Sequence, residues 1–202
     1  HSPLRPHRHM HGPSSSPYTC LRSYPASVEN YQLAELEKLR EFIKDMHLIE
    51  SFKTDLESSF TKVLGAPLGQ TPVFLRSDTN MEDLPQFTGA GLNLTLFNVL
   101  DSRTILEGIK KVWASPYTER SYSWRQTYLE NPENVFPSIL IIPSVNVDKS
   151  GVIITKNVEN GDETDISISF SNGVGGSVDG QSAESYILHD SGYNELNHPA
   201  RE

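Results

Sequence analysis

The hydrophobic periodicity of this chain changes once along its length, and that change constrains the fold more than any other feature. From Ser27 to Gly65, apolar residues recur at the three- and four-residue spacing of amphipathic helices. After Pro72, short apolar or alternating segments take over, which is typical of strands, with one further helical stretch over 102–130. Helices thus come first and strands dominate later, instead of alternating regularly, so we predict an α+β fold.

Cap residues place the ends of the predicted helices. Ser27 is a candidate N-cap for the first helix, and Gly65 suits the C-terminus of the second. Ser102 is the candidate N-cap of the third helical stretch, and Pro116 breaks that stretch or begins a second helix. The predicted strands cover residues 73–76, 92–99, 138–145, 150–157 and 164–170, with a strand or short helix at 182–188.

Composition excludes several classes of function. The chain has 202 residues and 36% hydrophobic content, enough for one large domain or two small lobes. A net charge of -9 argues against non-specific binding to nucleic acid or to an anionic membrane, so neither is an expected partner. An anion site must therefore be a local concentration of positive charge. No apolar run approaches the roughly 20 residues of a membrane-spanning helix.

The N-terminal segment and the cysteine and histidine residues bear on disorder, cellular compartment and metal binding. Residues 1–23 are rich in Pro, Ser and His, and we interpret them as a disordered tail rather than a metal tract. The lone Cys20 cannot form an intrachain disulfide, which fits a reducing compartment and a cytoplasmic location. It has no adjacent His, and His47, His189 and His198 lack a metal-ligand spacing.

The stretch "VFLRSDTNMEDLPQFTGAGLNLTLFNV" is the first candidate site. Arg76 ends an apolar strand and brings a permanent cation, while Ser77 adds a hydroxyl donor. Gly89 and Gly91 let backbone N–H groups approach a ligand closely enough to cradle phosphate oxygens. The alternative is an ordinary hairpin whose glycines only make a turn. No Gly-Lys-Ser/Thr follows, so this is not a Walker P-loop.

Two more segments are candidates. Arg120 in "WASPYTERSYSWRQ" shares a helix face with Trp124 and could reach a polyphosphate. The residues alone favour the alternative, in which Arg120 stacks on Trp124 or Tyr117 or pairs with Glu119. The loop "SNGVGGSVDGQ" after a predicted strand fits a nucleotide-edge loop, a flexible lid or a plain connection, and it is too loose for a dinucleotide fingerprint.

Four motifs occur in the same order in a known family. The segments "FLRSDTNMEDLPQFTGAGLNLTLFNV", "VWASPYTERSYSWRQ", "DKSGVIITKN" and "SNGVGGSVDGQSAES" span about residues 72–188. Together they make this chain resemble the N-terminal nucleotide-binding domain of the pyruvate phosphate dikinase and phosphoenolpyruvate synthase family. The same domain occurs in glucan, water dikinases and rifampin phosphotransferases.

The resemblance implies an ATP-grasp fold, in which two α+β lobes close on ATP. It implies that ATP, with Mg²⁺ assisting, phosphorylates a histidine on a separate swivelling domain. The phosphate then passes to an acceptor such as pyruvate, bound by another domain of the full-length protein. Fixed cations and N–H groups would stabilise charge on the transferring phosphoryl group.

The resemblance also assigns site residues. Arg76 and Arg120 match the arginines that contact the phosphates and carry the catalytic role. The ATP-binding positions are Arg76, Ser77, Thr88, Gly89, Gly91, Arg120, Gly175 and Gly176. Glu82 and Asp83 match an acidic pair that would position the loop.

Several family features are not seen in this chain, namely an early Gly-Lys segment, a strand with paired acidic metal ligands and a Thr-x-His motif. We therefore expect a partial ATP-grasp domain, incomplete at both ends, that is inactive by itself. The expected parts are a tail over 1–23, a helical region over 24–70, the partial domain over 71–190 and a truncated end over 191–202. The alternatives are a noncatalytic binding or regulatory module of the same fold and a plain α+β interaction domain.

Overall fold

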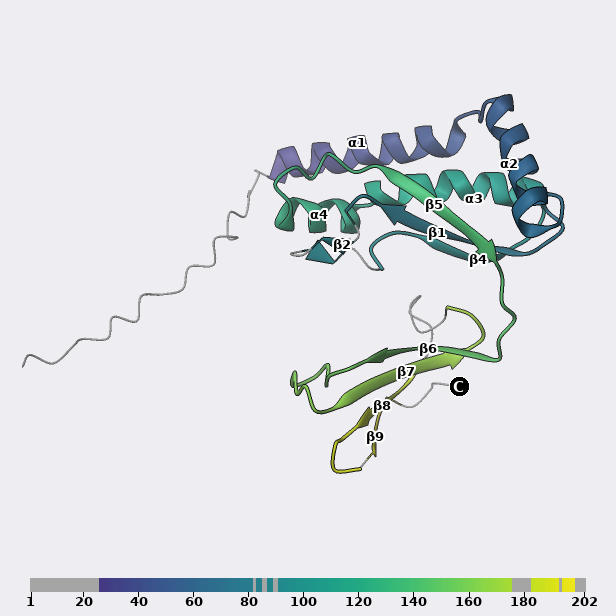
Figure 1. Cartoon of the computed structure of the whole chain (residues 1–202). Coiled ribbons are helices and arrows are strands. Elements are labelled where there is room, and N and C mark those ends of the chain that lie inside the picture. Colours follow the sequence, from purple (N-terminus) through teal and green to yellow (C-terminus); the bar gives the residue numbers. More distant parts are fainter. Residues whose placement is uncertain are drawn as a thin grey trace, which may run out of the picture.

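Two helices begin the described part of the chain (Figure 1). The computed structural model describes residues 26–81, 83–84, 87–88, 91–175, 183–192 and 194–198. Helix α1 spans Ala26–Asp45, so Ser27 lies within its first turn, and helix α2 spans Glu50–Leu64. As predicted, α2 ends before Gly65, whose φ of 71° is the left-handed conformation that glycine adopts at helix C-termini. Among the described helices, none carries the apolar stretch that a membrane span requires.

Helix α3 (Ser102–Ala114) is capped by Asp101, and the prediction that Ser102 is its N-cap is wrong. The Asp101 carboxylate accepts hydrogen bonds from the backbone N–H of Thr104 at 2.8 Å and from the Thr104 hydroxyl at 2.6 Å. A charged acceptor binds these donors more strongly than a serine hydroxyl would. The Ser102 hydroxyl instead donates to the carbonyl of Leu68 at 2.9 Å, which ties the loop after α2 to α3.

The helical stretch breaks at Pro116, as the sequence predicts. A short 3-10 helix, η1 (Ser115–Tyr117), follows α3, and helix α4 (Glu119–Tyr128) begins after it. Thr118 is the N-cap of α4, and its side chain accepts a hydrogen bond from the N–H of Ser121 at 3.4 Å. The helical stretch is therefore interrupted at Pro116, and a new helix begins after Thr118.

A three-stranded antiparallel sheet has β1 (Val73–Thr79) at its centre. Strand β4 (Thr95–Val99) pairs with one edge of β1, and β5 (Pro137–Pro143) pairs with the other. Strand β1 is longer than predicted, whereas β4 begins three residues later than the alternating pattern suggested. Between β1 and β4, the two-residue strands β2 (Asp83–Leu84) and β3 (Phe87–Thr88) form a short ladder.

The main core lies between one face of this sheet and helices α2 and α3 (Figure 1). Leu75 of β1 is fully buried, and Ile105 and Ile109 of α3 are buried in the same cluster. Gly108 lets α3 come close, because a Cβ there would lie 2.5 Å from Leu75 Cδ1. The opposite face of the sheet carries no helix among the described elements.

A second antiparallel sheet follows as a meander of four strands. Its strands are β6 (Lys149–Ile154), β7 (Ile166–Asn172), β8 (Glu184–Leu188) and β9 (Asn194–His198). The sequence pattern predicts β6 and β7, leaves β8 open between a strand and a short helix, and fades before β9. In β7, Ser167 is buried while Ile166 is 37% exposed. Ser167 is buried because the loop after β6 covers it, and the Val158 N–H donates to the Ser167 hydroxyl at 3.0 Å.

The two faces of the first sheet should differ sharply in their contribution to stability. We expect Leu75→Ala to lower the free energy of unfolding by about 2–5 kcal/mol, because it removes fully buried methyl groups from beneath α3. Leu140→Ala is the matched control on the neighbouring strand, where the side chain is 51% exposed on the other face. Its effect should stay within about 0.5 kcal/mol. Urea unfolding measures both, and equal losses would contradict this assignment of the faces.

The Asp101 cap should make stability depend on pH. Hydrogen bonds from Thr104 lower the pKa of the Asp101 carboxyl below its ordinary value. The cap therefore stabilises the fold above the unfolded-state pKa, and this contribution is lost as pH falls through the lowered pKa. Asp101→Asn keeps an acceptor and tolerates the φ of 65°, but does not titrate. Urea unfolding from about pH 6 to about pH 3 should show a smaller acid-induced loss for the variant; identical pH curves would contradict the cap's role.

Candidate functional site

Arg76 lies in the middle of β1, on the face of the sheet that points away from α3. The two-residue period of the strand buries Leu75 and leaves Arg76 exposed. Thr95 of β4 and Leu140 of β5 are its Cα partners. We call this side of the β4-β1-β5 sheet the open face. Asp78 shares it two residues further along β1, and its carboxylate lies 3.1 Å from the Ser138 hydroxyl.

Apart from the buried Arg125, the described arginines fall into two groups. Arg40 pairs with Glu37, and Arg103 pairs with Glu107 at 2.8 Å. In contrast, the side chains of Arg76 and Arg120 form no hydrogen bond or ion pair with any part of the chain that the structure describes. A guanidinium has five donors and no acceptor, so these two exposed side chains keep their donors available for an anion.

Arg125 is buried and has a structural role. It is 4% exposed, and it donates to the carbonyl of Pro116 at 2.6 Å and to that of Pro132 at 3.2 Å. Burial lowers the pKa of this guanidinium from its ordinary value. Arg125 therefore fixes α4 against η1 and against the loop before β5. Trp124, on the exposed side of α4, packs against Tyr128 with ring centroids 4.7 Å apart.

The segment Leu92–Leu94 connects the two candidate arginine stretches. The Ser77 N–H donates to the Leu94 carbonyl at 3.3 Å, and Ser77 follows Arg76 directly. The Ser121 hydroxyl donates to the Leu92 carbonyl at 2.7 Å, and Ser121 follows Arg120 directly. The structure thus ties both stretches to one short segment, the first through a backbone N–H and the second through a side-chain hydroxyl.

Two serines missed by the sequence reasoning make this connection. Ser121 is completely buried, and its hydroxyl also lies 3.1 Å from Asn93 Oδ1. Ser115 accepts a hydrogen bond from the Leu94 N–H at 3.0 Å and donates to the Val112 carbonyl at 2.8 Å. Their only signal in the sequence is their position beside Pro116 and Arg120, because hydroxyl partners distant in sequence follow no local pattern.

Part of the predicted site lies outside the described residues. These positions are Glu82, Gly89 and Gly176. For Asp83 and Thr88 the structure gives only the strand pairing, in which the two residues face each other across the β2–β3 ladder. Gly91 is described, and its φ of 74° places it in the left-handed region that glycine favours. The role of the acidic pair in positioning the loop remains a prediction.

Gly175 lies in the loop after β7 and also has a left-handed backbone, with a φ of 79°. Its N–H donates to the Ser150 hydroxyl at 3.0 Å. A Cβ at Gly175 would lie 2.5 Å from Cε2 of Phe97, which belongs to β4 in the first sheet. The glycine loop of the second sheet therefore contacts the open face of the first sheet directly.

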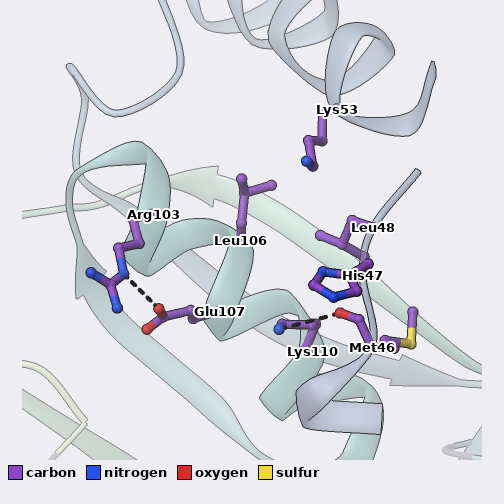
Figure 2. Close-up of a pocket in the computed structure, with 8 residues that line it drawn as sticks. All are labelled: Met46, His47, Leu48, Lys53, Arg103, Leu106, Glu107 and Lys110. Carbon is purple, nitrogen blue, oxygen red and sulfur yellow. Dashed lines mark hydrogen bonds and ion pairs between the residues drawn. The ribbon is translucent and has the colours of Figure 1, made fainter. Parts of the chain in front are cut away.

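A cavity of about 380 Å³ lies elsewhere, between the end of α1, α2 and α3 (Figure 2). These helices cover the core side of the sheet, so this cavity is separated from Arg76 by the sheet itself. Its cationic groups already have partners: Arg103 pairs with Glu107, Lys53 pairs with Glu50 at 2.7 Å, and Lys110 lies 3.4 Å from the Met46 carbonyl. We therefore assign the candidate site to the open face and not to this cavity.

The described side chains do not form a metal centre. Within the described ranges, no three His, Cys, Asp or Glu side chains gather closely enough to hold a metal ion. His189 and Asp165 are 3.0 Å apart, and Asp165 also accepts from the Asn157 amide at 2.9 Å. This small polar network joins the loop before β7 to the end of β8.

Known proteins resemble this chain over most of its length. The family described as "Pyruvate phosphate dikinase, AMP/ATP-binding domain" matches residues 20–197, which is most of the chain. The match includes the Arg76 strand, η1, α4 and the glycine loop after β7.

Individual relatives are large proteins. Phosphoenolpyruvate synthase of Pyrococcus furiosus is 30% identical over 144 residues, which is 70% of this chain and 18% of that protein. Phosphoenolpyruvate synthase of Aeropyrum pernix is 29% identical over 146 residues, covering 70% of this chain and 18% of that protein. Rifampicin phosphotransferase of Streptomyces sviceus is 29% identical over 121 residues, covering 60% of this chain and 14% of that protein. The chain therefore spans less than a fifth of the length of these relatives.

Ser121 should be important for holding the Leu92–Leu94 segment. Ser121→Ala removes the donor to the partly buried Leu92 carbonyl, and we expect a loss of about 1–3 kcal/mol in the free energy of unfolding. Ser123→Ala, at an exposed position of the same helix, should change it by less than about 0.5 kcal/mol. Urea unfolding compares them, and equal stabilities would show that Ser121 does not fix this segment.

Proposed function

Because this chain belongs to the pyruvate phosphate dikinase AMP/ATP-binding domain family, we propose that it is the ATP-binding part of a dikinase-type phosphotransferase. The observation that carries the proposal is the pair of exposed arginines without a described partner, Arg76 and Arg120. The residues that follow them are hydrogen-bonded to the same segment, Leu92–Leu94. In a chain of net charge -9, two such arginines, each preceding a residue bound to this segment, would provide a local anion site.

In this proposal, Arg76 and Arg120 bind the phosphate oxygens of ATP. A guanidinium stays charged and can form two parallel hydrogen bonds to a phosphate, which favours it over lysine for fixing orientation. Charge that develops on the phosphoryl oxygens during transfer would then be stabilised by groups that need no rearrangement. Both arginines therefore serve binding and catalysis.

We propose that backbone donors and hydroxyls complete the phosphate site. Gly91 has a left-handed backbone of the kind that exposes N–H groups at a turn, which supports this role. Gly175 is proposed as an ATP-binding position for the close approach of its backbone, because its own N–H donates to Ser150. The other proposed ATP-binding positions are Ser77, Thr88, Gly89 and Gly176, with Glu82 and Asp83 holding the loop. ATP would lie between the two sheets, as in an ATP-grasp fold, and the contact between Gly175 and Phe97 supports such an arrangement.

The later steps of the reaction are proposed from family membership. The phosphate would pass from ATP to a histidine of a separate swivelling domain and then to an acceptor such as pyruvate. The relatives named as phosphoenolpyruvate synthase and as rifampicin phosphotransferase act on different molecules, so we propose that other domains select the acceptor. Mg²⁺ would assist, but the described residues offer it no ligand cluster and we assign it no step. A cytoplasmic location remains part of the proposal.

The proposal predicts that ATP affinity depends on Arg76. Arg76→Ala should raise the Kd for ATP roughly 10- to 150-fold, because a hydrogen bond to a charged group is worth about 1.5–3 kcal/mol. Arg76→Lys should recover only part of the affinity, since the paired hydrogen bonds are lost. Calorimetric titration of the chain with ATP measures each Kd.

Arg103→Ala is the matched control, because Arg103 is an exposed arginine on the helical side and pairs with Glu107. Its Kd should equal that of the unchanged chain. Equal Kd values for Arg76→Ala and the unchanged chain would contradict the assignment. A binding module without transfer activity would show the same dependence on Arg76, and a phosphoryl-transfer assay on the full-length protein separates the two functions.

A further inference from the structure

A β-bulge in β4 sets the direction of the Phe97 side chain on the open face. In the β1–β4 ladder, Leu75 pairs with Leu96 and Val73 pairs with Val99, so Phe74 faces two residues, Phe97 and Asn98. Asn98 accommodates the extra residue with a φ of 53°, a conformation that asparagine tolerates better than most side chains. Bulges of this kind redirect a neighbouring side chain. The ring of Phe97 packs edge-on against Phe74, with centroids 5.4 Å apart.

Phe97 is also next to Arg76. Thr95, two residues before Phe97 in β4, is the Cα partner of Arg76. Residues two apart in a strand share a face, so Phe97 and Arg76 are diagonal neighbours. Whatever contacts the exposed side of Phe97 therefore lies beside the proposed phosphate-binding arginine.

The second sheet makes that contact through Gly175. A Cβ there would lie 2.5, 2.7 and 2.9 Å from three carbons of the Phe97 ring, so any larger residue would force the two apart. The loop cannot simply retreat, because it is tied to its own sheet. The Gly175 N–H donates to Ser150 Oγ at 3.0 Å, and the Gly173 N–H donates to the Asp148 carbonyl at 2.8 Å.

Gly173 is a control for Gly175, because it shares the left-handed backbone but has free space where a Cβ would lie. Its φ of 71° is also left-handed, but nothing lies within 4 Å of the position that its Cβ would occupy. Glycine at 173 is needed only for the backbone conformation. Glycine at 175 is needed for the backbone and for the approach of Phe97.

We propose that the Phe97–Gly175 contact seats the second sheet on the first and sets the spacing between them beside Arg76. Phe97 and Gly175 are then positioning residues: they influence ATP affinity by setting the distance between the two sheets. The effect on ATP rests on the proposed function, whereas the seating of the sheets does not.

The test compares four variants of the chain by calorimetric titration with ATP: Gly175→Ala, Gly173→Ala, Phe97→Leu, and Gly175→Ala with Phe97→Leu. Gly175→Ala should weaken ATP binding about tenfold more than Gly173→Ala, a difference of about 1.4 kcal/mol. Leucine lacks the two ring carbons nearest to the position that a Cβ at 175 would occupy, so the double variant should recover most of the affinity lost in Gly175→Ala. Equal affinities for Gly175→Ala and Gly173→Ala, or no recovery in the double variant, would overturn the positioning role.

A second measurement tests the seating without ATP. In the nuclear magnetic resonance spectrum, the ring of Phe97 should displace the α-proton resonances of Gly175 from those of Gly173, and Phe97→Leu should abolish that displacement. Unchanged Gly175 resonances in Phe97→Leu would overturn the contact itself. If the unchanged chain binds no ATP while the displacement is present, the proposed function fails and the seating of the sheets is supported.

Discussion

The alternation of side chains along β1 is the constraint on which the rest of the structure depends. Val73 and Leu75 enter the core beneath α3, while Phe74 and Arg76 stand on the open face. A register slip of one residue would exchange the two sets and bury a guanidinium without a partner, which is strongly unfavourable. The two-residue alternation along β1 thus determines both which residues form the core and which face carries Arg76.

Much of the fold could be predicted because local patterns determine it. Gly65 ends α2, and Pro116 separates α3 from α4, as expected from backbone preferences that operate within a few residues. The failures have tertiary causes. Asp101 rather than Ser102 caps α3 because Ser102 is engaged by Leu68, which lies 34 residues earlier in the sequence. Strand β9 has no apolar alternation and exists by pairing with β8.

The candidate site was predictable in its charges but not in its scaffold. Arg76 and Arg120 could be selected because a permanent cation beside glycines and hydroxyls suggests phosphate chemistry. The hydroxyl of Ser121 and the ring of Phe97 could not, because their partners come from other elements. Family membership can be recognised because several motifs occur in the same order over most of the chain. The steric fit between two sheets produces no local sequence pattern that could be recognised in the same way.

The close approach of α3 to β1 has a consequence for how this sequence can evolve. Since a Cβ at Gly108 would lie 2.5 Å from Leu75 Cδ1, the two positions must change together. A homologue with alanine at the helix position should carry a smaller residue at the strand position, or its helix must move outward. Such a shift would be transmitted along β1 to Arg76, the neighbour of Leu75. Substitutions on the buried side of the sheet can therefore alter the candidate site on its other side.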